Sequence, residues 1–196
     1  MSRIERVIGI DVSLTSTGIA VVHRDLRAAA DSIPSKGQRG DTIAQRAQRM
    51  RQIGNQVGDW LYGGTLNAGT PTVLTIVEAP VSVQHPGGST WDRAGLWWDI
   101  VARALACGPV ATVSPTTRAK WATGKGNADK AAVAAAMTRY APQVEISNSD
   151  EADALALAYM GAQKLGWVIA TGSVQYAAID SVTWPERVAA EMERVA

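Results

Sequence analysis

Four acidic residues stand at positions where a purely structural role is hard to assign. Asp11 ends one apolar, strand-like run and Glu78 ends another, while Asp150 and Asp153 open an Ala/Leu-rich stretch. On a helix, the three-residue spacing of the last pair places both side chains on one face. Burying unpaired carboxylates costs several kcal/mol, and neighbouring carboxylates repel one another. A divalent cation removes both penalties, because Mg²⁺ prefers carboxylate oxygens as ligands.

Convergence of these acids would create a hydrolytic centre. If the helix packs its first turn beside the two strand ends, the site has the donors for two Mg²⁺ ions roughly 3.5–4 Å apart, the arrangement that activates water in phosphodiester hydrolysis. Mn²⁺ is expected to substitute for Mg²⁺. The predicted catalytic residues, which are also the predicted metal ligands, are Asp11, Glu78, Asp150 and Asp153.

Each acid also has a simpler explanation. Asp150 and Asp153 could complement a helix dipole after an N-cap at Asn148. Asp11 could be a turn residue that bonds the polar loop at 13–17. Glu78 follows a strongly strand-forming run and has the weakest structural explanation, so the combination of the four favours a functional site.

A basic segment lies between the second acid and the C-terminal pair. Residues 114–130 carry four cations against a single acid, Asp129, with Gly124 and Gly126 among them. Small residues permit close approach of the backbone to a phosphate, and cations give salt-dependent affinity for DNA; the alternative is an ordinary solvated loop. No P-loop and no GxGxxG spacing is present, so no nucleotide cofactor is expected. The predicted DNA contacts are Arg118, Lys120, Lys125 and Lys130.

Hydrophobic periodicity predicts the elements that would position these residues. Gly63 and Gly64 are expected to end the helix at 42–62, and Pro80 is expected to stop the strand run that Glu78 closes. Residues 81–91 are expected to form a loop. The order βββαβαβαα is typical of an α/β fold whose mixed sheet has helices on both faces. The predicted strands are 6–12, 18–23, 27–33, 72–77 and 110–113, and the predicted helices are 42–62, 91–106, 128–139 and 150–166.

Length and composition limit the class of protein. The 196 residues suit one domain with a short appendage, and 46% hydrophobic content indicates a folded chain. A net charge of +1 excludes a general polycation, so DNA affinity must come from local patches. Cys107 is the only cysteine, which excludes an intramolecular disulfide and a cysteine-based zinc site. No apolar run has the length of a signal peptide or membrane span, so a cytoplasmic protein without membrane partners is expected.

The ordered motifs resemble those of one nuclease family. Gly9-Ile-Asp-Val-Ser-Leu-Thr-Ser-Thr-Gly18 is similar to the first hairpin of RuvC-type Holliday junction resolvases, and Ile76-Val-Glu-Ala-Pro80 is similar to their second acidic motif. Asp150-Glu-Ala-Asp-Ala-Leu resembles their C-terminal acidic helix, and Ser114–Lys130 resembles the basic segment before it. The resemblance covers residues 6–166 and includes bacterial and bacteriophage members.

This resemblance implies a fold and an activity. The expected fold is an RNase H-like five-stranded mixed sheet with helices on both faces, built from residues 1–166, with 167–196 as a C-terminal extension packed on or near this domain. The expected activity is symmetric, Mg²⁺-dependent nicking of four-way DNA junctions by a homodimer. The four acids would be the metal ligands, and Lys120 and Lys130 would contact phosphates.

One position departs from the family pattern. Bacterial members place an aromatic residue three positions after the second acid, where this chain has Val81 and has no Phe at all. Trp91 or the loop at 81–90 could take its place, although Trp91, Trp97 and Trp98 are expected to be mostly core. Activity on flaps or forks is therefore a second hypothesis, and a non-catalytic DNA-binding protein is a third. An actin-like ATPase, suggested by the Gly9–Thr15 stretch alone, would need a longer chain with two such domains.

Overall fold

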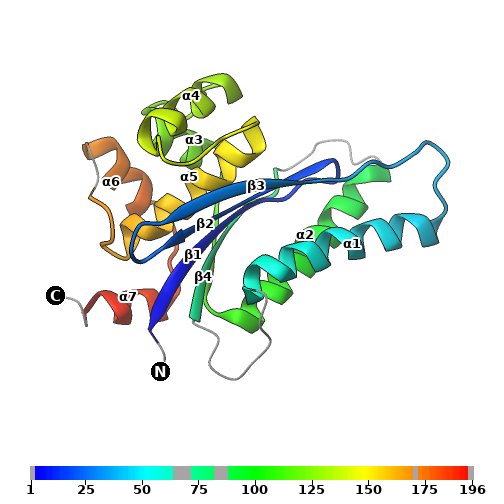
Figure 1. Cartoon of the computed structure of the whole chain (residues 1–196), viewed down its shortest axis with the longest axis horizontal. Helices are drawn as coiled ribbons and strands as arrows, with labels where there is room; N and C mark the ends of the chain where they lie inside the picture. Colours follow the sequence, from blue (N-terminus) through cyan, green and yellow to red (C-terminus); the bar gives the residue numbers. More distant parts are fainter. Residues whose placement is uncertain (1–2, 64–71, 82–87, 170–171, 194–196) are drawn as a thin grey trace.

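A mixed five-stranded sheet with the order β3-β2-β1-β4-β5 forms the centre of the fold (Figure 1). The computed structural model describes residues 3–63, 72–81, 88–169 and 172–193. Antiparallel pairing joins β1, β2 and β3, whereas β4 and β5 run parallel to β1. The strands are β1 (Ile4–Asp11), β2 (Ser16–His23), β3 (Ala28–Pro34), β4 (Thr72–Glu78) and β5 (Val110–Val113).

The register of the two central parallel strands brings the first two acids together. Ile10 of β1 lies beside Val77 of β4, so the next residues, Asp11 and Glu78, end neighbouring strands at the same edge of the sheet. The carboxyl ends of parallel strands are where α/β sheets commonly place their sites. On the other side of β1, Asp11 pairs with Gly18 of β2.

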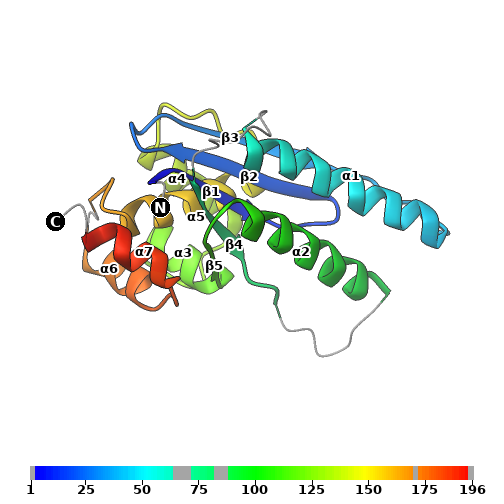
Figure 2. The same ribbon diagram turned by 90° about the horizontal axis from the view of Figure 1, so that it is seen from below.

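Helices cover both faces of the sheet, as the sequence predicted (Figures 1 and 2). One face packs against α5 (Ser149–Lys164), which is flanked by α3 (Pro115–Thr123), α4 (Lys130–Tyr140) and α6 (Ser173–Asp180). The other face packs against α1 (Ile43–Tyr62) and α2 (Gly88–Cys107), which form a second core with the sheet. The expected α/β architecture, a five-stranded mixed sheet between helices, is confirmed.

Two glycines allow α5 to lie directly on the sheet. A Cβ added at Gly9 would lie 2.0 Å from the carbonyl oxygen of Ala154, and one at Gly18 would lie 2.0 Å from that of Asp150. Any side chain at either position would therefore push the helix away from β1 and β2. Helix α5 is buried along most of its length, from Glu151 to Gln163, so its position is fixed by packing on several sides.

The C-terminal segment packs on the same body as the sheet. Helix α6 contacts α3, and α7 (Glu186–Glu193) lies near the start of β1, where Arg3 Nε is 3.8 Å from Glu191 Oε1 (Figure 1). Four apolar residues of this segment belong to the core cluster that contains α5: Ala178, Ile179, Val182 and Val188. Among the described helices, none is both long and apolar enough to cross a membrane.

Two helices were missed in the sequence. Helix α3 occupies residues of the basic segment to which no helix was assigned, and α6 lies in the segment that had no assigned structure. Both are short, and hydrophobic periodicity is weak over so few turns. The start of α3 has a local signal nonetheless, because the Ser114 hydroxyl accepts from the backbone N–H of Thr117 and Pro115 follows it. The expected loop at 81–91 gives way to α2 from residue 88, and 82–87 lie outside the described residues.

We expect Gly18→Ala to destabilise the protein by about 1–3 kcal/mol, because its methyl group would overlap the backbone of α5. Urea unfolding at equilibrium measures the change. Gly58→Ala in α1 is the matched control: its Cβ meets nothing closer than 3.7 Å, and alanine favours a helix. Equal stabilities of Gly18→Ala and the parent protein would show that α5 does not depend on this close approach.

Candidate active site

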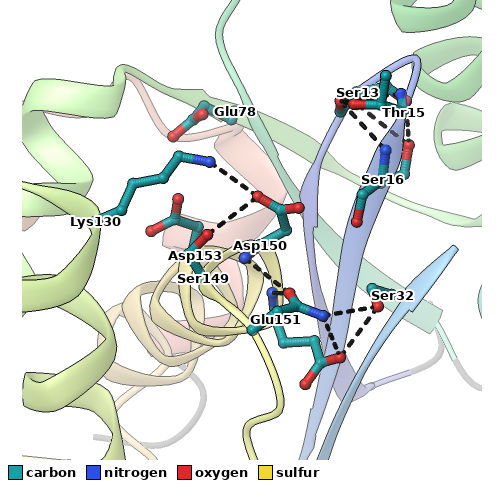
Figure 3. Close-up of polar contacts among 12 residues, drawn as sticks. Ser13, Thr15, Ser16, Ser32, Glu78, Lys130, Ser149, Asp150, Glu151 and Asp153 are labelled. Carbon is teal, nitrogen blue, oxygen red and sulfur yellow. Dashed lines mark hydrogen bonds and ion pairs between the residues drawn. The ribbon is translucent and has the colours of Figure 1, made fainter. Parts of the chain in front are cut away.

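All four predicted acids line one cavity at the carboxyl edge of the sheet. Its volume is about 320 Å³, and its walls come from β1, β4 and helices α2 to α5. Figure 3 shows Glu78, Asp150 and Asp153 directed toward a common space. The sequence prediction that acids from two strands and one helix meet in one place therefore agrees with the structure.

The acids at the start of α5 lie on different sides of the helix. The Asn148 side chain caps the helix and accepts from the backbone N–H groups of Asp150 and Glu151, both at 3.0 Å. Glu151 turns away from the cavity, where it accepts from Ser32 Oγ at 3.1 Å and from the backbone N–H of Ser147 at 2.6 Å (Figure 3). Asp150 and Asp153 are left to line the cavity, so the N-cap and the functional placement coexist.

Arg118 lies inside the acidic cluster. Its Nε donates to Glu78 Oε1 at 2.6 Å, and its Nη1 donates to Asp153 Oδ1. The side chain is buried, because α3 carries it inward from the basic segment toward β4 and α5. A DNA contact by Arg118 stays a prediction, but here its guanidinium binds two carboxylates and is not presented to solvent.

The other predicted basic residues are exposed. Lys130 Nζ donates to Asp150 Oδ1 at 2.9 Å at the rim of the cavity, and this hydrogen bond raises the pKa of the lysine (Figure 3). Lys120 lies on α3 and Lys125 lies just after it, both exposed to solvent. Only Lys130 of these three lines the cavity.

Burial and mutual repulsion perturb the acids. Burial, together with the neighbouring Glu78 carboxylate, raises the pKa of Asp11 to about 7. Burial raises the pKa of Asp153 to about 6, although Arg118 opposes the shift. Asp153 Oδ2 is buried and has no hydrogen-bond partner among the residues that the structure describes. A buried carboxylate oxygen of this kind, next to other acids, is a donor that a divalent cation would satisfy.

The four acids have the oxygen donors that a divalent cation prefers, but three of them already bind cationic side chains. In the described part of the chain, no three His, Cys, Asp or Glu side chains are arranged as they stand to hold a metal ion. Arg118 holds one oxygen each of Glu78 and Asp153, and Lys130 holds one of Asp150. Metal binding through these three oxygens therefore requires Arg118 or Lys130 to release them, whereas Asp153 Oδ2 is bound by neither cation.

Helix α2 adds two residues that the sequence had not assigned to the site. Trp97 Nε1 donates to the backbone carbonyl of Glu78 at 2.8 Å, and Arg93 lines the cavity mouth. Trp91 and Trp98, which were expected to be mostly core, are instead 75% and 65% exposed. They lie seven residues apart on the outer face of α2, whereas Trp97 faces the sheet.

Solved structures identify the class of fold. Thermus thermophilus RuvC matches over 92% of this chain and 99% of its own, with a TM-score of 0.63 and 20% identity. The same protein in complex with a Holliday junction substrate matches with a TM-score of 0.61, and the yeast mitochondrial Holliday junction resolvase with 0.50. The chain is thus an α/β protein with the RNase H-like fold of RuvC.

Curated relatives identify the family. A crossover junction endodeoxyribonuclease RuvC from Frankia alni is 31% identical over 154 residues, which span 78% of this chain and 75% of the relative. RuvC from Corynebacterium efficiens is 29% identical over 162 residues, spanning 78% and 66%. No protein-family model matches the chain. With these relatives, the chain belongs to the RuvC family of endodeoxyribonucleases, and the expected enzyme class, an endonuclease, is confirmed.

We expect the metal-free protein to lose stability as the pH rises from about 4 to about 7. The pKa values of Asp11 and Asp153 are raised on folding, so the folded state binds more protons than the unfolded state in this range and is stabilised at its acidic end. The Tm in chelator should fall by roughly 2–8 °C across it. Asp11→Asn should flatten the profile, while Glu145→Gln, an exposed acid, should not. A parent profile that rises over this range would contradict the raised pKa values.

Proposed function

We propose that this protein is a Mg²⁺-dependent, structure-selective DNA endonuclease that resolves Holliday junctions by paired, symmetric nicks near the branch point. The observation that carries the proposal is the meeting of Asp11, Glu78, Asp150 and Asp153 in one cavity of a RuvC-family chain. A Thermus relative with this fold is known in complex with a Holliday junction substrate, which supports a four-way junction as the substrate.

The four acids would hold the Mg²⁺, which supplies an activated water and neutralises charge on the scissile phosphate; Mn²⁺ should replace it. The chain's own contribution is to hold these carboxylates together at a partly buried edge of the sheet, with Asp153 fully buried. Lys130 at the rim is exposed, so its ammonium can leave Asp150 and bind a DNA phosphate. That exchange would free an Asp150 oxygen for the metal.

DNA is proposed to lie across the mouth of this cavity. Lys130 and Arg93 flank the mouth from α4 and α2, and Lys120 and Lys125 extend the basic surface outward from α3. These side chains contact phosphates and provide affinity that falls with salt, without reading base sequence.

A homodimer is proposed to use the outer face of α2. Trp91, Trp98 and Leu105 recur every seven residues and are 75%, 65% and 59% exposed, with Gly95 and Ala102 exposed between them. This apolar stripe has the a/d spacing of a helix that packs against another helix. Pairing with a second copy would bury the stripe and supply the second active site that paired nicks require.

A second candidate function is cleavage of other branched DNA, such as flaps and forks. Val81, the residue three positions after Glu78, is 69% exposed and lines the cavity. A valine cannot stack on bases as an aromatic side chain does, so opening of a four-way junction would need another group. Trp91 is exposed on the same helix as Arg93 and offers such a surface in a protein that does not pair through α2.

We expect Asp153→Asn to cut four-way junctions at least ~100-fold more slowly than the parent in Mg²⁺ while it still binds them in Ca²⁺. The loss follows because the fully buried Asp153 supplies a site oxygen, Oδ2, that has no hydrogen-bond partner among the described residues. Nicking of labelled junction, flap and linear duplex is measured with Mg²⁺ and with chelator, and Glu145→Gln serves as the exposed-acid control.

Near-normal cutting by Asp153→Asn would show that the catalytic site is wrongly assigned. Preference for flap over junction by the parent protein would select the second candidate function. Binding without cleavage of any substrate would indicate a non-catalytic DNA-binding protein.

We expect Trp98→Glu to convert the dimer into a monomer, because a carboxylate would be buried at the centre of the α2 stripe. Size-exclusion chromatography with light scattering measures the mass of each species. Tyr176→Glu is the matched control, since it places the same charge on another exposed aromatic residue, on α6. A parent protein that is monomeric, or a dimeric Trp98→Glu variant, would exclude this interface.

A further inference from the structure

The position of Arg118 differs from that of an ordinary DNA-contacting cation. One guanidinium bridges Glu78 of β4 and Asp153 of α5, which lie 40 and 35 residues away in the sequence. Its side chain is 8% exposed. The planar fork of a guanidinium suits two carboxylates at once. Arg118 is therefore a fixed positive charge of the site.

Lys130 provides the contrast. Its ammonium has one carboxylate partner, Asp150, and its side chain is 65% exposed. Solvent can replace that partner at little cost, because exposed ion pairs are weak. Withdrawal of Arg118 would leave a guanidinium or two buried carboxylates unpaired, which is strongly unfavourable. Of these two cations, only Lys130 can leave readily.

Charge and donor atoms limit what else the site can hold. The one charge of Arg118 already pairs with two carboxylates, Glu78 and Asp153, which leaves less negative charge for cations at that end of the cluster. Arg118 also occupies Glu78 Oε1 and Asp153 Oδ1, which a second ion between these residues would need. The buried Asp153 Oδ2 remains unpaired and faces the same cluster as Asp11 and Asp150.

We propose that Arg118 takes the place of one of the two divalent cations of this site, so that the protein binds a single divalent ion, ligated by Asp11, Asp150 and the free oxygen of Asp153. This deepens the proposed function and rests on its metal dependence. Arg118 then acts as a positioning residue, which holds Glu78 and Asp153 together before the metal binds. The sequence, by contrast, indicated donors for two ions.

Counting bound Mn²⁺ tests this proposal without DNA or catalysis. The chain is titrated with Mn²⁺, and electron paramagnetic resonance of the free ion gives the number bound per chain. We expect one ion for the parent protein and for Arg118→Lys, which keeps the charge. Arg118→Ala should bind two, because both carboxylates are released to a second ion. Arg139→Ala, the loss of an exposed arginine on α4, is the control and should bind one.

Each outcome is decisive. Two ions on the parent protein would overturn the role of Arg118 but leave a metal-dependent nuclease intact, and one ion on folded Arg118→Ala would do the same. No ion on the parent protein would overturn the metal-dependent function as well. If Arg118→Ala unfolds in chelator, Mn²⁺ should restore its circular dichroism spectrum, and failure to do so counts against the proposal.

Discussion

The contact between helix α5 and the first two strands is the constraint on which the site depends. At Gly9 and Gly18 the backbone of the helix lies where side chains would otherwise be, so there is no separate layer of side chains between them. This contact sets the height of the first turn of α5 above the end of β1. Asp150 and Asp153 can reach the same cavity as Asp11 only because the helix is this close.

The close approach of α5 also brings four acidic side chains together, and two cationic side chains balance their charge in part. Burial, together with repulsion between neighbouring carboxylates, raises the pKa of Asp11 to about 7 and that of Asp153 to about 6. Arg118 and Lys130 come from α3 and α4, the two helices that follow the sheet. The basic segment therefore has a structural part, which keeps the acids together, and a solvent-exposed part available to DNA.

The sequence predicted the sheet and the acids because both follow from local patterns. Apolar strand runs mark β1, β2 and β4. The acids that end β1 and β4 could be recognised because a buried carboxylate without a partner is unfavourable. The inward position of Arg118 could not be predicted, because its partners are set by tertiary packing of a helix too short to show periodicity. Trp98 was wrongly assigned to the core because its residue type does not distinguish burial within one chain from an apolar face left exposed.

The adjacent tryptophans of α2 have a consequence for altering this protein. Trp97 points inward and holds the carbonyl of Glu78, whereas Trp98 points outward, and their rings meet edge to face with centroids 4.8 Å apart. Helix α2 is thus held to the carboxyl edge of the sheet on one side and exposes an apolar surface on the other. A more soluble variant would therefore be made by replacing Trp98 and keeping Trp97. Loss of Trp97 would remove the hydrogen bond that links α2 to the end of β4.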